Sequence, residues 1–231
     1  MHPSIAAALA PGQPGWLVRN AGFLPGVATT AAQIEIFAAH WRNLAEEALD
    51  GEHAHDRTPL LVVLGDSLAQ GIGASEPNHG YVGRVRRLLA GDGAEPPVVN
   101  LSRSGAKIAD VLTEQLPALA EVPGQANTVI CTVGSNDLVR STRLGQTKRQ
   151  MTALIHALPP TAILATVPDK GSVAAMLLNR HLRAEAARAN LAIADVAANL
   201  TTWRGNRAGD RFHPNDRGYT AWVDAFSAAC G

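Results

Sequence analysis

The chain has 231 residues, and its 20 Lys and Arg side chains balance 20 Asp and Glu side chains to a formal net charge of zero. This length fits one domain of ordinary size with an extension, and it is enough to bury a substantial hydrophobic core. The charge balance argues against nucleic acid or an anionic membrane surface as the main partner.

The first 27 residues are rich in Gly and Pro and show no sustained hydrophobic period, so we expect a partly ordered arm there. The apolar piece 5–10 lacks the basic segment that opens a secretory signal, and no stretch approaches the ~20 apolar residues of a membrane span. Cys131, inside an apolar run, and Cys230, next to the last residue, make no disulfide framework. We therefore expect a cytoplasmic protein without an integral membrane segment, while the oligomeric state stays open.

An amphipathic helix is predicted between Thr29 and Leu49, because apolar residues recur there at intervals of three and four. Either Thr29 or Thr30 could cap its N-terminus. We expect the helix to pack on the rest of the chain, since an isolated helix of this length is marginal in water. The residues of its apolar stripe are Ile34, Phe37, Trp41, Leu44 and Ala48.

A polar linker, 50–57, follows the helix and contains His53-Ala54-His55. Two imidazoles two residues apart on a strand can share a metal ion. No strand precedes this pair and its flanks are typical of a linker, so we assign no metal. The domain boundary is placed here, with an extension over residues 1–57 and a second domain over residues 58–231.

The second domain alternates continuous apolar runs with helical patterns. Continuous apolar runs are typical of strands buried on both faces, and strict alternation with helices predicts a three-layer α/β/α sandwich around a five-stranded, mainly parallel sheet. The predicted strands are 60–64, 98–101, 128–133, 162–166 and 191–195. The predicted helices are 81–90, 108–119, 143–158, 173–189 and 216–229.

A nucleophilic triad is the first chemistry that the sequence indicates. Ser67 follows directly on the first predicted strand, where ligands bind in open α/β sheets. Asp210 and His213 are close enough in sequence for one turn to join carboxylate and imidazole. The hydroxyl of a serine needs such a base to become a nucleophile, and the base needs a carboxylate to orient it. We therefore predict Ser67 as nucleophile, His213 as general base and Asp210 as its partner.

Other interpretations of these residues exist. Asp66-Ser67 could simply cap a helix, and His213 could be a surface histidine. Asp195 and Asp216 are alternative carboxylates, although Asp216 is expected to begin the last helix. Asp66 is expected to bond backbone N–H groups of its own loop. The Gly-x-Ser-x-Gly elbow of another hydrolase fold does not fit, since Ala69 stands where its second glycine belongs.

Four sequence blocks in order resemble the SGNH hydrolases, the GDSL-type esterases and lipases, from Thr58 to the C-terminus. They are Gly65-Asp66-Ser67, Asn100-Leu101-Ser102-Arg103-Ser104-Gly105, Gly134-Ser135-Asn136-Asp137-Leu138 and Asp210-Arg211-Phe212-His213-Pro214-Asn215. The resemblance implies an oxyanion hole made by the backbone N–H groups of Ser67 and Gly105 and the side-chain amide of Asn136. Taken alone, Gly105 and Asn136 could also be ordinary turn residues.

The function implied is that of a serine esterase, which hydrolyses carboxylic esters through an acyl-enzyme without a metal or organic cofactor. Its partner would be a small-molecule, lipid or sugar ester. Acyl transfer to another alcohol by the same triad stays open. A non-catalytic, doubly wound ligand-binding domain is the rival from another class, although neither Gly-x-Gly-x-x-Gly nor a P-loop pattern follows the first strand.

Overall fold

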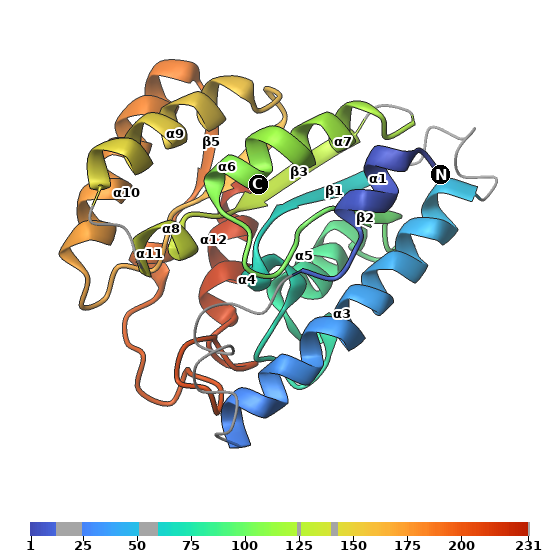
Figure 1. Cartoon of the computed structure of the whole chain (residues 1–231), viewed down its shortest axis with the longest axis horizontal. Coiled ribbons are helices and arrows are strands. Elements are labelled where there is room, and N and C mark those ends of the chain that lie inside the picture. The colour runs from blue at the N-terminus through green and yellow to red at the C-terminus, as the bar shows by residue number, and fades with distance from the viewer. Residues whose placement is uncertain (13–24, 51–59, 124–125, 140–142, 231) are drawn as a thin grey trace.

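The computed structural model describes residues 1–12, 25–50, 60–123, 126–139 and 143–230 (Figure 1). Its centre is a five-stranded sheet in the order β2-β1-β3-β4-β5, and every neighbouring pair is parallel. This order is the flavodoxin-like one of doubly wound folds. The predicted sheet is confirmed. Its strands are β1 (Leu60–Gly65), β2 (Val98–Asn100), β3 (Ala126–Thr132), β4 (Ala162–Ala165) and β5 (Ala192–Ala194).

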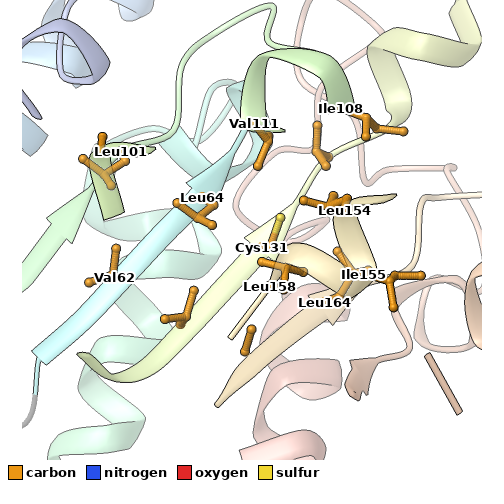
Figure 2. Close-up of a cluster of buried hydrophobic side chains, with 14 of the residues drawn as sticks. Val62, Leu64, Leu101, Ile108, Val111, Cys131, Leu154, Ile155, Leu158 and Leu164 are labelled. Atoms are coloured by element: carbon orange, nitrogen blue, oxygen red, sulfur yellow. The ribbon is translucent and has the colours of Figure 1, made fainter. Parts of the chain in front are cut away.

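Alternate residues of the strands face two separate cores. Val62 and Leu64 of β1 enter one core with Cys131 of β3, whereas Leu61 and Val63 enter the other. Figure 2 shows the first core, where these side chains meet others from the helices above. Because both faces are covered, the strands are mostly apolar, and they therefore appear in the sequence as continuous apolar runs.

Helices cover both faces of the sheet and complete the predicted three layers (Figure 1). The first face carries α1 (Pro3–Ala8), α6 (Ile108–Asp110), the π-helical turn η3 (Val111–Gln115), α7 (Leu116–Ala120), α9 (Leu144–Ala157) and α10 (Val173–Ala189). The other face carries α5 (Tyr81–Ala90), α11 (Val196–Asn199) and α12 (Thr220–Cys230). Short helices follow three loops: α4 (Ser67–Gln70), η2 (Pro77–His79) and α8 (Ser135–Val139). No helix in the described parts of the chain is both long and apolar enough to cross a bilayer.

The N-terminal helix α3 (Pro25–Asp50) packs along β2, the edge strand of the sheet. Four of the five stripe residues are buried and Leu44 is partly buried: Trp41 is 1% exposed and joins the second core, while Ala48 joins the first. The indole N–H of Trp41 donates to the carbonyl of Gln70 at 3.0 Å. Since an uncovered edge strand offers free backbone groups, α3 protects the sheet as well as burying its own apolar face.

Two predictions for the N-terminal region are wrong. The expected arm contains the helix α1, which begins at Pro3 and buries Ile5 and Ala8. The helix could not be recognised in the sequence because its six residues are too few to show a hydrophobic period. The long helix α3 begins at Pro25, and the Thr30 hydroxyl donates to carbonyls of its own first turn instead of capping it. The predicted boundary at residues 57 and 58 and the pair His53 and His55 lie outside the described residues.

Two predicted helices of the second domain also differ from the structure. The segment 108–119 is divided into α6, η3 and α7. Pro117 has no backbone N–H to donate to the preceding turn, and the helix widens into the π-helical turn η3 just before it. The last helix begins at Thr220 and not at Asp216, since the segment before it is held in turns by Asn215. Asp216 therefore does not begin the helix, contrary to expectation.

Candidate active site

Ser67 lies where β1 turns into α4. The strand ends at Gly65, whose φ is +140°, and a Cβ atom there would lie 2.1 Å from the carbonyl oxygen of Thr132, so only glycine fits. Asp66 then caps α4 by accepting the Leu68 N–H at 2.9 Å, as expected for its loop. This places Ser67 at the first position of the helix, 7% exposed, at the carboxyl end of β1.

His213 and Asp210 approach this serine from the loop before α12. The Nε2 atom of His213 lies 2.9 Å from Ser67 Oγ, and its Nδ1 lies 2.6 Å from Asp210 Oδ2. All three side chains are buried. The structure therefore brings together, in a single hydrogen-bonded series, the three residues that the sequence singled out.

The local fold of this loop explains how Asp210 reaches His213. One carboxylate oxygen of Asp210 accepts the backbone N–H groups of Phe212 and His213, and the other faces the imidazole. Arg211 adopts a positive φ of 59°, which turns the chain between them. Burial by itself would raise the pKa of Asp210, but the hydrogen bond and charge of His213, together with the two backbone donors, hold it below its usual value. Asp210 is therefore kept as a carboxylate.

Asn136 and Gly105 lie at the same edge of the sheet. Asn136 Nδ2 donates to the carbonyl of Ala106 at 2.9 Å and lies 3.4 Å from Asp66 Oδ2. Gly105 has a φ of +82°, and among the described residues neither its backbone N–H nor that of Ser67 has an acceptor. The loop after β2 is tied to the loop that carries Ser67, because the Arg103 N–H donates to the carbonyl of Gly65 at 3.1 Å.

A buried polar network, not identified from the sequence, supports this edge. Gln115 of η3 accepts the N–H of Gly65 at 2.7 Å and donates to its carbonyl at 2.8 Å. Gln70 donates to the Ser102 carbonyl and accepts from the Ser104 hydroxyl. Asn100 donates to the carbonyl of Ala69. These amides fix the backbone on both sides of Ser67, and the π-helical turn is what points Gln115 inward.

Two carboxyl groups near Ser67 and Asn136 have raised pKa values. Burial, the largest cause, raises the pKa of Asp66 from 3.8 to about 7 against the Leu68 hydrogen bond, and the charge of Asp137 adds to it. Burial likewise raises the pKa of Asp137 to about 6, although its Oδ2 accepts the N–H of Ile108 at 3.2 Å. Perturbed groups of this kind are concentrated at functional sites.

The alternative carboxylates are engaged elsewhere. Asp216 accepts both the N–H and the hydroxyl of Ser75, at 2.7 and 2.6 Å. Asp195 caps α11 and pairs with Arg183. Within the described ranges, no three His, Cys, Asp or Glu side chains gather closely enough to hold a metal ion.

A serine, a histidine and an aspartate hydrogen-bonded in series at the strand ends of an α/β sandwich form the arrangement of a serine hydrolase. The comparison with protein families agrees with this class. Residues 63–221 match the GDSL-like lipase/acylhydrolase family, and the chain belongs to that family. It is accordingly a hydrolase of ester bonds. The search of curated proteins found no match.

Solved structures share the fold. TesA is 24% identical with a TM-score of 0.62, over 74% of this chain and 97% of that one. A lipase/acylhydrolase from Enterococcus faecalis is 23% identical with a TM-score of 0.59, over 74% and 94%. A variant of Axe2, an acetyl xylan esterase from Geobacillus stearothermophilus, is 23% identical with a TM-score of 0.59, over 75% and 94%. At this level of identity, the similarity shows the fold alone.

Proposed function

We propose that the protein hydrolyses carboxylic esters through an acyl-enzyme, with Ser67 as nucleophile, His213 as general base and Asp210 as its orienting carboxylate. The observation that carries this proposal is the geometry of the series, with 2.9 Å between Ser67 Oγ and His213 Nε2 and 2.6 Å between Nδ1 and Asp210 Oδ2. The first distance allows proton transfer from Ser67 Oγ to His213 Nε2 without rearrangement, and the second lets Asp210 orient the imidazole.

In the first half-reaction, Ser67 Oγ attacks the ester carbonyl carbon while His213 Nε2 takes its proton. The imidazolium would be stabilised by Asp210, whose lowered pKa favours its ionised form. The tetrahedral intermediate then expels the alcohol, which receives the proton from Nε2. Water repeats these steps on the acyl-enzyme: His213 takes a proton from water, hydroxide adds to the carbonyl carbon, and the proton returns to Ser67 Oγ as the acid leaves.

The negative charge of the intermediate needs preorganised donors, and we assign this role to the N–H groups of Ser67 and Gly105 and the amide of Asn136. The two backbone groups have no acceptor among the described residues, so an oxyanion would satisfy them. One N–H of Asn136 is held by Ala106, and the other faces Asp66 at 3.4 Å. The 3.4 Å contact is long for a hydrogen bond, so this N–H can donate to an oxyanion in its place.

The decisive experiment is Ser67→Ala, assayed with p-nitrophenyl acetate and with a fluorophosphonate probe. Loss of the nucleophile typically costs on the order of 10⁴ to 10⁶ in rate. The fold should persist, because the change removes one hydroxyl and leaves the capping residue Asp66 in place. Ser227→Ala, on an exposed turn of α12, is the matched control and should keep full activity. Near-normal hydrolysis by folded Ser67→Ala protein would refute the assignment.

A further inference from the structure

The side chain of Gln33 clamps one peptide segment of the nucleophile loop. Its Oε1 accepts the N–H of Gly73 at 2.9 Å, and its Nε2 donates to the carbonyl of Ala74 at 2.7 Å. Gln33 belongs to α3, which lies before the first residue of the family match, 63–221. The two bonds need one donor and one acceptor on the same side chain, which an amide provides and a carboxylate does not.

The clamped segment contacts the backbone of Ser67 and the side chain of His213. At its start, the carbonyl of Ser67 accepts the N–H of Ile72 at 3.0 Å. At its end, a Cβ atom on Gly73 would lie 2.8 Å from the Cβ of His213 and 2.4 Å from the carbonyl oxygen of Pro214. The backbone of Gly73 is therefore in direct contact with the base of the imidazole side chain. A shift of this backbone moves His213 relative to Ser67.

The first turn of α3 contacts the residue that precedes Asp210. A Cβ atom on Gly26 would lie 2.2 Å from the carbonyl oxygen of Gly209, the residue before Asp210. The same helix thus contacts the segment that follows Ser67 and the segment that precedes Asp210. It is anchored at Trp41, which is 1% exposed and bonded to the Gln70 carbonyl, so it is a rigid support for both.

We propose that Gln33 is a positioning residue for the ester hydrolysis, which acts through Gly73 to set the separation of Ser67 Oγ and His213 Nε2. This inference rests on the proposed function of that pair. A misplacement of about 1 Å at reacting groups can cost roughly 10²-fold in rate. Since Gln33 reaches the backbone of the loop and not the substrate, its loss lowers kcat and leaves KM nearly unchanged.

The test uses the full chain with Gln33→Met, which removes both hydrogen bonds and keeps the length and helix propensity of the side chain. Glu35→Met is the matched control, because Glu35 is exposed on the same helix. Ala48→Gly is a second control, which weakens α3 near its far end without touching the loop. For each protein we measure kcat and KM on p-nitrophenyl acetate, the rate of fluorophosphonate labelling, and the melting temperature.

We expect Gln33→Met to lower kcat and the labelling rate by about 10- to 100-fold with KM within about twofold of wild type. Both controls should keep kcat, even where Ala48→Gly melts at a lower temperature. A folded Gln33→Met protein with wild-type kcat would overturn the inference, as would an equal loss of kcat in Ala48→Gly. Wild-type protein that is not labelled on Ser67 would instead overturn the proposed function.

Discussion

Asp66 makes the stability of the protein depend on pH in a direction opposite to that of most carboxylates. It is 1% exposed, and burial raises its pKa from 3.8 to about 7, with a further contribution from the charge of Asp137. The folded state therefore binds the proton more tightly than the unfolded state does. The stabilisation is fully present below about pH 4, where both states are protonated, and it is lost as the pH rises to about 7.

The magnitude follows from the difference between the two pKa values. Each unit of pKa difference is worth about 1.4 kcal/mol, so between pH 5 and pH 8 the contribution of Asp66 should fall by roughly 3 kcal/mol. Asp66→Asn removes the ionisation and keeps the cap, because Asn accepts the Leu68 N–H about as well as Asp does. The variant should therefore lose this part of the pH dependence without losing α4.

Urea unfolding of the wild type and of Asp66→Asn at pH 5, 6, 7 and 8 measures the effect. Asp195, Asp210 and Asp216, whose pKa values are lowered on balance by their hydrogen-bond partners, favour folding at higher pH in both proteins and cancel in the difference. The free energy of unfolding of the variant should increase relative to that of the wild type as the pH rises. Two parallel profiles over this range would show that Asp66 is ionised in the folded state, and the reasoning would be refuted.

Asn136→Ala should lower kcat by roughly 10² to 10³ with a much smaller change in the affinity for a neutral substrate analogue, because the amide meets charge that develops only in the transition state. An equal loss of analogue affinity would make Asn136 a structural residue held by Ala106. Trp41→Ala should cost about 3–5 kcal/mol in the free energy of unfolding measured with urea, since the indole is 1% exposed in the second core and bonded to Gln70. A cost below about 1 kcal/mol would mean that α3 is not part of the stable core.

The sheet could be predicted because each strand carries its own signal. A run such as 60–64 is apolar at every position, and burial on both faces is the physical cause. Asp210 and His213 could be paired for a similar reason, since they are three positions apart and one turn joins them. Ser67 follows a strand end, whereas the loop before α12 brings Asp210 and His213 to it only through the fold.

The network beneath Ser67 could not be predicted in this way. Gln115 and Gly65 are bonded across fifty residues of sequence, and Gln70 reaches Ser102 across thirty-two. A lone glutamine in a helical pattern gives no sign of its partner, because the partner is a backbone group. The predicted helix 108–119 hid Gln115 further, since a regular helix does not contain the widened turn that directs this side chain inward.

The contacts between α3 and the site could not be predicted from the sequence motifs of the family. The apolar stripe of α3 did predict that the helix is buried, because apolar residues at a helical period indicate a buried face in any protein family. Small and polar residues of α3 make the contacts with the site, and such residues follow no helical period. Gln33 is hydrogen-bonded to the backbone of Gly73 and Ala74, and Gly26 packs against Gly209. Both partners lie inside residues 63–221, whereas α3 lies before them. The sequence match with the family therefore covers the segments that carry Ser67, Asp210 and His213 but leaves out the helix that packs against two of them.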